Sequence, residues 1–259
     1  MYTEKFLTIN GNVVHYLDND SQSSNLIVIF PPGIQDARFV QELELISLER
    51  IICLSYSSRY KSSILNEFNS LENIANICVN FLKIYLKEND IQNVKLVGFS
   101  FGTAVITKIV DKQLEFNISD IILINAGEFF NKFVNFLLKL VFFPALRSNR
   151  YAKFLKFVLT KLTKIFNPEY FPDNRLIQIN EQWISTLDHM VDTKRKVSIH
   201  SVFMDANFDK VIANKSLNKL KTKFKDAEFI DYQGNHIFSY KNSLDYLKIR
   251  EILHNKLKF

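Results

Sequence analysis

Short apolar runs alternate with amphipathic stretches along most of the chain. Residues 5–9 and 13–17 are strand-like and flank Asn10-Gly11, a pair typical of a β-hairpin turn. The run Asn-Leu-Ile-Val-Ile-Phe at 25–30 predicts a strand buried on both faces. Further strands are expected at 50–54, 94–97, 120–124, 198–204 and 228–232, and helices at 36–48, 70–87, 103–111, near 215–224, and at 243–256. This alternation predicts an α/β fold, a mostly parallel sheet with helices on both faces.

The alternation stops after Gly127 and resumes near residue 198, which indicates inserted helices. We therefore expect an α/β core formed by 1–127 and 192–259, with a helical cap at 128–191. Segment 129–171 contains ten phenylalanines. After Ser148, apolar residues recur at helical spacing, at Tyr151, Leu155, Val158, Leu162 and Ile165. The lysines lie mainly away from this stripe, so a basic amphipathic helix is predicted.

The positive charge of the chain is confined to this region. The net charge is +6, and segment 129–168 holds eight basic residues and no acidic one. Outside that segment, acidic residues outnumber basic ones. General nucleic-acid binding is therefore not expected.

The composition is that of a folded domain, with 47% hydrophobic and 23% charged residues. No secretory signal or membrane-spanning run is recognised in the sequence. Cys53 and Cys78 both lie in apolar segments and are expected to be buried free thiols, which suggests a cytoplasmic location. No spacing of cysteines and histidines indicates a metal site, and no cofactor is expected.

Gly98-Phe99-Ser100-Phe101-Gly102 matches the G-x-S-x-G pattern in a chain with only six glycines. The pattern needs a strand before it and a helix after it, so that a sharp turn exposes the serine hydroxyl. The predicted strand 94–97 and helix 103–111 supply both. We therefore predict that Ser100 is a nucleophile; the alternative is a glycine-bounded turn without chemistry.

A serine hydroxyl needs a base, usually histidine, and a carboxylate that orients the histidine. His236 follows the strand 228–232 in a loop, which places it at the same sheet edge as Ser100. The other histidines, His15, His189, His200 and His254, are interpreted as surface or core residues. Asp209 follows the strand 198–204 and is favoured as the acid, with Asp205 and Glu128 as alternatives.

Acyl transfer also needs hydrogen-bond donors for the oxyanion. One is expected to be the N–H of Phe101, and the other the N–H of Ile34, or else of Gly33, in the loop after strand 25–30. Pro31 and Pro32 have no N–H. Gly33 and Phe99 are expected to contact the substrate.

These residues resemble the α/β-hydrolase superfamily over nearly the full length of the chain. The resemblance rests on the elbow 98–102, on Asp209, on Gly234-Asn235-His236 and on the turn Pro32-Gly33. It implies an eight-stranded sheet whose second strand is antiparallel, and a helical cap inserted after the sixth strand. Pro32-Gly33 replaces the His-Gly that many relatives carry, and Thr103 stands where many have glycine. The first departure leaves the second oxyanion donor open, and the second is expected to change only local packing.

The expected activity is hydrolysis of an apolar acyl or aromatic ester. Thioesterase, lactonase, C–C hydrolase and acyltransferase activities are alternatives, as is a non-catalytic binding module. The cap lysines are interpreted as a solvated face, or alternatively as a contact for an anionic membrane or an acyl carrier.

Overall fold

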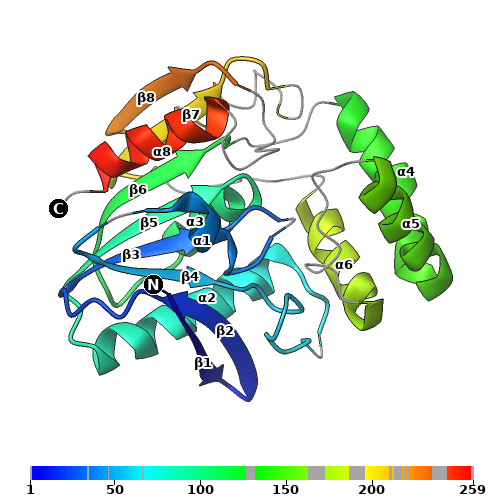
Figure 1. The fold of residues 1–259 in the computed structure, drawn as a ribbon, viewed down its shortest axis with the longest axis horizontal. Helices are drawn as coiled ribbons and strands as arrows, with labels where there is room; N and C mark the ends of the chain where they lie inside the picture. Colours follow the sequence, from blue (N-terminus) through cyan, green and yellow to red (C-terminus); the bar gives the residue numbers. More distant parts are fainter. Residues whose placement is uncertain are drawn as a thin grey trace.

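The computed structural model describes residues 2–33, 35–45, 47–65, 67–126, 132–162, 173–186, 196–209, 212, 218, 220, 222–234 and 244–257. One sheet runs through the molecule (Figure 1). Its strands are β1 (Thr3–Ile9), β2 (Asn12–Asp18), β3 (Asn25–Phe30), β4 (Arg50–Leu54), β5 (Asn93–Phe99), β6 (Ile118–Ile124), β7 (His200–Ala206) and β8 (Ala227–Tyr232).

The spatial order of the strands is β1-β2-β4-β3-β5-β6-β7-β8. β2 is antiparallel to β1 and β4, and the remaining neighbours are parallel. This confirms the predicted eight-stranded, mostly parallel sheet and its antiparallel second strand.

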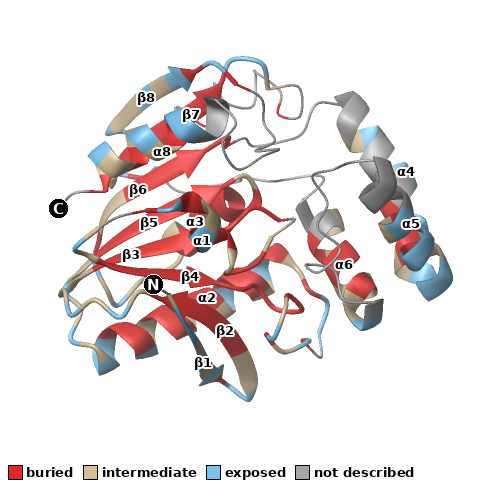
Figure 2. Ribbon diagram, in the orientation of Figure 1, coloured by how far each residue is buried: buried red, intermediate tan, exposed pale blue. Residues whose placement is uncertain are grey.

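Helices cover both faces of the sheet. Helices α2 (Leu71–Glu88) and α3 (Phe101–Val110) pack on one face, and α1 (Phe39–Leu43) and α8 (Leu244–Lys256) on the other. Along β3, Leu26, Val28 and Phe30 face the first group, while Ile27 and Ile29 face the second. The strand is therefore buried on both faces, as its continuous apolar run predicts (Figure 2).

Local side chains set the helix boundaries. Ser70 begins α2 as its N-cap, since its side chain accepts a hydrogen bond from the Asn73 N–H at 3.1 Å. The helix expected at 36–48 is much shorter, only Phe39–Leu43. The Asp36 side chain binds the Arg38 N–H at 2.9 Å and holds a turn before the helix, and Glu44 adopts a left-handed φ of 47° after it.

Two other expected elements differ in position. β7 lies at His200–Ala206 instead of 198–204, because the preceding Val197 instead forms an isolated bridge with Phe224. That bridge also means that the helix expected near 215–224 does not reach Phe224. Most of that helix lies outside the described residues.

The inserted region contains helices α4 (Lys132–Arg147), α5 (Asn149–Leu162) and α6 (Leu176–Thr186), with a short 3₁₀ turn, η2 (Asp173–Arg175), before α6. The three helices share a small apolar cluster of their own, formed by Phe142, Ala145, Ala152, Leu155, Leu176 and Ile179. α6 lies between the core and the pair α4/α5 (Figure 1). In the described part of the chain, no helix has the length and hydropathy needed to cross a bilayer.

Candidate active site

Ser100 occupies the sharp turn between β5 and α3. Its backbone has φ 49° and ψ −109°, a left-handed conformation that serine seldom adopts. Its N–H donates to the Ile124 carbonyl at 2.9 Å, at the end of the neighbouring strand β6. Its carbonyl accepts from the Thr103 N–H at 2.9 Å and from the Thr103 hydroxyl at 2.6 Å. Thr103 therefore adds a hydrogen bond to the turn, beyond the packing change that the sequence suggests.

The two glycines of the elbow leave no room for side chains. A Cβ on Gly102 would lie 2.2 Å from the Phe30 carbonyl oxygen, and one on Gly98 would lie 2.8 Å from the Gly102 backbone. Both distances are far below van der Waals contact. The G-x-S-x-G spacing is therefore a packing requirement in this molecule, since β3, β5 and α3 approach each other at these positions.

The turn after β3 lies against the residue that follows Ser100. A Cβ on Gly33 would lie 3.0 Å from the Phe101 Cβ. Hydrogen bonds hold the turn's carbonyls: Pro31 accepts from the Tyr56 hydroxyl at 2.7 Å, and Pro32 from the Gln35 N–H at 2.9 Å. The two segments predicted to form the oxyanion hole are thus neighbours.

The loop that carries Asp209 is bonded to the end of β8. The N–H groups of Asn207 and Phe208 donate to the carbonyls of Tyr232 and Gly234, each at 3.0 Å. The Asp209 carboxylate accepts from the Ile212 N–H at 2.9 Å, which orients it. Asp209 therefore lies beside the segment that leads into His236. Asp205 lies within β7, opposite Asp231 of β8, and is mostly buried.

Asn125, at the end of β6, links three strand ends, and sequence reasoning missed it. Its backbone has a φ of 53°. Its side-chain oxygen accepts from the Ala206 N–H at 3.2 Å and from the Tyr232 hydroxyl at 2.8 Å. It thereby joins the ends of β6, β7 and β8, from which the predicted acid and base loops start. The tolerance of asparagine for left-handed backbone is the signal that could have marked it.

Three predicted residues, His236, Ile34 and the alternative acid Glu128, lie outside the described residues, as does His189. The other histidines are elsewhere. His15 is buried, with Nδ1 2.8 Å from the Ser55 hydroxyl, and burial lowers its pKa. His200 begins β7 and pairs with Asp120 at 3.0 Å, and His254 belongs to α8. These placements agree with the core and surface interpretations.

The two phenylalanines beside Ser100 point into the protein. Phe99 is buried and packs edge-on against Phe39 of α1, with ring centroids 4.8 Å apart. Phe101 packs edge-on against Tyr56 on the other side of the sheet at 5.1 Å. Both rings pack in the protein interior on either side of the sheet, next to the turn at Ser100. Substrate contact by Phe99 stays a prediction.

Arg59 is a second residue that the sequence did not mark, and its hydrogen bonds link the turn after β3 to the cap. The side chain is fully buried, and this burial lowers its pKa to about 9, so the guanidinium remains charged at neutral pH. It donates to the Gly33 carbonyl in the turn after β3, and to the Gln182 side chain of α6 at 3.2 Å. The turn after β3 and the cap are therefore joined through one cation.

Cys53 and Cys78 are buried and free, as predicted. Burial raises the pKa of both thiols, that of Cys78 to about 12. Neither thiol is available as a nucleophile at neutral pH.

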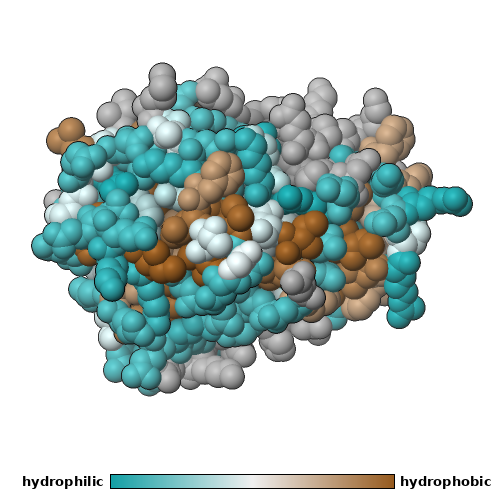
Figure 3. Space-filling view, turned by 90° about the horizontal axis from the view of Figure 1, so that it is seen from below, coloured by the Kyte–Doolittle hydropathy of each residue, from teal (hydrophilic) through white to brown (hydrophobic). Residues whose placement is uncertain are grey.

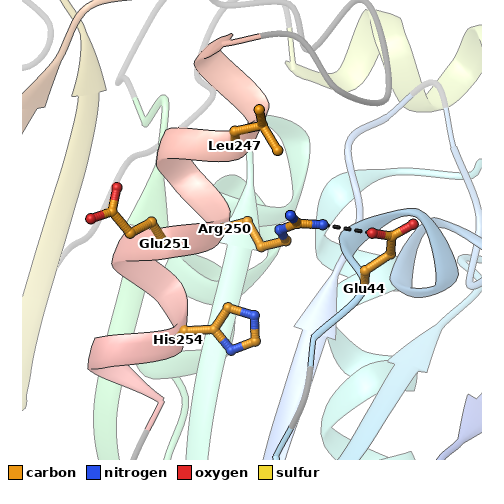
Figure 4. Close-up of a pocket in the computed structure, with 5 residues that line it drawn as sticks. All are labelled: Glu44, Leu247, Arg250, Glu251 and His254. Carbon is orange, nitrogen blue, oxygen red and sulfur yellow. Dashed lines mark hydrogen bonds and ion pairs between the residues drawn. The ribbon is translucent and has the colours of Figure 1, made fainter.

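A surface groove lies away from these residues. It is lined by Glu44 at the end of α1 and by Leu247, Arg250, Glu251 and His254 of α8 (Figure 4). Arg250 pairs with Glu44 across it at 2.6 Å. No predicted site residue lines this groove. Among the described residues, no three His, Cys, Asp or Glu side chains form a group that could hold a metal ion.

No protein-family model and no curated protein matches the chain. Solved structures do. An α/β hydrolase, MGS-M2, from a Medee basin deep-sea metagenome library has a TM-score of 0.74 at 14% identity, with 98% of both chains covered. The esterase EaEST from Exiguobacterium antarcticum has a TM-score of 0.72 at 16% identity, with 99% of this chain and 98% of that one covered.

The Cif epoxide hydrolase from Acinetobacter nosocomialis also has a TM-score of 0.72, at 14% identity, with coverage of 99% and 89%. These likenesses extend over nearly the whole chain. The protein therefore has the α/β-hydrolase fold.

Proposed function

We propose that the protein is a serine hydrolase that cleaves carboxylic esters of an apolar acyl or aromatic group. The observation that carries the proposal is the conformation of Ser100. Ser100 has a positive φ and lies at the start of helix α3, between two glycines whose positions admit no side chain. The turn after β3, which other hydrogen bonds hold, lies beside it. Strain of this kind persists where the surrounding structure enforces it, and it is typical of functional sites.

The proposed mechanism follows from this placement. The Ser100 Oγ attacks the ester carbonyl while His236 takes its proton, and Asp209 orients His236. The N–H groups of Phe101 and Ile34 stabilise the oxyanion, assisted by the N-terminal dipole of α3. His236 then donates the proton to the departing alcohol. Water, deprotonated by His236, releases the acid and restores Ser100.

The alternatives share this chemistry up to the acyl-enzyme. A thioesterase, lactonase or C–C hydrolase differs in the bond broken, and an acyltransferase replaces the water with another nucleophile. The preference for an apolar acyl group rests on the sequence of segment 129–171, which contains ten phenylalanines. The folds of an esterase, a thioesterase domain and epoxide hydrolases are all similar to this one, so the fold alone does not choose among substrates.

A fluorophosphonate probe tests the nucleophile directly. We expect the intact protein to be labelled once, and Ser100→Ala to remain unlabelled. Ser21→Ala, which changes a surface serine that hydrogen-bonds the Leu48 carbonyl, is the control and should label as the wild type does. Labelling that persists in Ser100→Ala would refute the nucleophile. No labelling of the intact protein would favour a binding module instead.

A substrate panel then separates the esters from the alternatives. We expect turnover of p-nitrophenyl esters to rise from acetyl to medium-chain acyl groups, and to be lost in Ser100→Ala. His236→Ala should lose turnover by about 10³-fold or more, since the serine is then without its base. Faster turnover of matched thioesters than of esters would assign the protein to the thioesterase alternative.

A further inference from the structure

The outermost helices of the cap, α4 and α5, carry an unusual combination of side chains. Five large apolar residues are 46 to 61% exposed: Phe136, Leu140 and Phe143 on α4, and Phe154 and Phe157 on α5. On each helix they recur at intervals of three or four residues, so they form one face. Exposed aromatic rings in such a group indicate an interaction surface.

The opposite faces of both helices are already occupied. Phe142 and Ala145 of α4, with Ala152 and Leu155 of α5, pack against α6 in the cap's apolar cluster. α6 in turn contacts α2 of the core. The exposed rings therefore point away from the core, at the end of the molecule where α4 and α5 lie (Figure 1). In Figure 3, hydrophobic surface lies beside protruding hydrophilic side chains at this end.

The charge of this surface is of one sign. Helices α4 and α5, with the single residue Ser148 between them, contain seven Lys and Arg and no Asp or Glu. Arg147, Arg150 and Lys153 are exposed and lie around the step from α4 to α5, next to Phe143 and Phe154. Cationic and aromatic side chains thus share the same outer surface.

We propose that the outer face of α4 and α5 binds an anionic lipid bilayer. Helices that lie in a membrane interface insert apolar side chains at the level of the acyl chains and keep Lys and Arg among the headgroups. The exposed rings on the two helices would contact the acyl chains, and the three cations would contact the anionic headgroups. A second copy of this chain is a poorer occupant, because it would bring the same three cations, Arg147, Arg150 and Lys153, against this face. The proposal concerns a surface that the proposed catalytic residues do not share.

Vesicle sedimentation with the full-length protein tests the proposal. We expect binding to vesicles of phosphatidylcholine with 25% phosphatidylglycerol, and at least about tenfold weaker binding to phosphatidylcholine alone. Raising the salt from 0.1 M to 0.5 M should weaken binding to the anionic vesicles, since screening shortens the reach of the cations. Equal binding to both compositions, or none to either, would overturn the proposal.

Two pairs of variants locate the surface. The charge variant, Arg147→Gln with Arg150→Gln and Lys153→Gln, should lose about tenfold or more in binding to anionic vesicles. Its control changes three exposed lysines outside the cap, Lys87, Lys196 and Lys225, to Gln and should bind like the wild type. The apolar variant, Phe136→Ser with Phe154→Ser, should lose about tenfold. Its control is Leu48→Ser with Ile84→Ser, which changes two exposed apolar residues outside the cap and should bind like the wild type.

Site-specific fluorescence gives an independent measurement that needs only single substitutions at exposed positions. Since both native cysteines are buried, Phe154→Cys accepts a nitrobenzoxadiazole label selectively, and Ile84→Cys on α2 serves as the control. Emission should rise and shift to the blue with anionic vesicles only at position 154. The same response at both positions would contradict the assigned face. Loss of a dimer in the apolar variant, without vesicles and without a change in vesicle binding, would assign the face to a second copy.

Discussion

Around Ser100, a single methyl group added at Gly102 would meet backbone at 2.2 Å, whereas on α4 and α5 whole phenylalanine rings are about 60% exposed. In the first region, the backbone is tightly packed at Gly98 and Gly102, and hydrogen bonds hold the turn at Ser100. The second buries only one face in a small cluster of its own. The difference indicates that the core holds Ser100 in a fixed geometry, while the cap presents a surface.

The largest effect is expected when a side chain is added at a glycine of the elbow. Gly102→Ala must displace the Phe30 carbonyl, so we expect the free energy of unfolding to fall by about 3 kcal/mol or more, with loss of probe labelling. Gly11→Ala is the matched control: Gly11 has a φ of 78°, and its Cβ would meet nothing within 4 Å. It should cost only the backbone strain, about 1 kcal/mol. Urea unfolding measures both values, and equal losses would show that the elbow is not packed as described.

A buried arginine at each end of the parallel strands gives the second test. Arg59 binds the Gly33 carbonyl in the turn after β3 and Gln182 of α6, while Arg50, where β4 begins, pairs with Asp18 at 2.8 Å. Arg59→Met should slow fluorophosphonate labelling of Ser100 by about 10- to 100-fold, because the Gly33 turn loses its anchor.

Arg50→Met is the control for that change. It should lower the free energy of unfolding by about 2 kcal/mol, since the buried Asp18 carboxylate loses one of its two cations and keeps Lys5 at 3.1 Å, yet leave the labelling rate within about twofold. If the two variants label equally slowly, Arg59 contributes only to stability and has no positioning role. Labelling is the informative readout here, because both substitutions are expected to destabilise the protein.

Much of the fold follows from local sequence patterns. Continuous apolar runs mark strands buried on both faces, and the rarity of glycine gives weight to Gly98 and Gly102. The places of Ser100 and Asp209 follow from the rule that parallel strands end at one edge of the sheet. The predicted length of α1 was wrong, because the Asp36 side chain accepts a hydrogen bond from the Arg38 N–H and the helix begins only at Phe39. The spacing of apolar residues does not reveal such a side-chain hydrogen bond.

The two linking residues, Asn125 and Arg59, could not be predicted, because their partners are distant in sequence. Asn125 meets Tyr232, 107 residues away, and Arg59 meets Gln182, 123 residues away. Neither residue belongs to a recurring local pattern. An arginine in a loop is ordinarily read as solvated, and only the packing of the cap on the core reveals that this one is buried.

The smallest effect is expected from a cavity in the cap. Leu155→Ala removes one of the six residues of the cap cluster, whereas Leu96→Ala makes the same change in the centre of the sheet. Leu96→Ala should cost about 3 kcal/mol of unfolding free energy. Leu155→Ala should lower the free energy of unfolding of the core by less than about 1 kcal/mol, because local opening of the cap is separable from global unfolding.

Hydrogen exchange with mass spectrometry distinguishes the two outcomes. For Leu155→Ala, amides of α4, α5 and α6 should exchange faster while those of α2 and β5 stay protected, since the lost contacts lie within the cap cluster. Slower probe labelling of Ser100 in this variant is not expected, because Gly33 keeps its bond to Arg59 even when α6 loosens. Faster exchange throughout β5 and α3 would show instead that cap and core unfold as one unit, and the contrast between a fixed core and a separable cap would then be wrong.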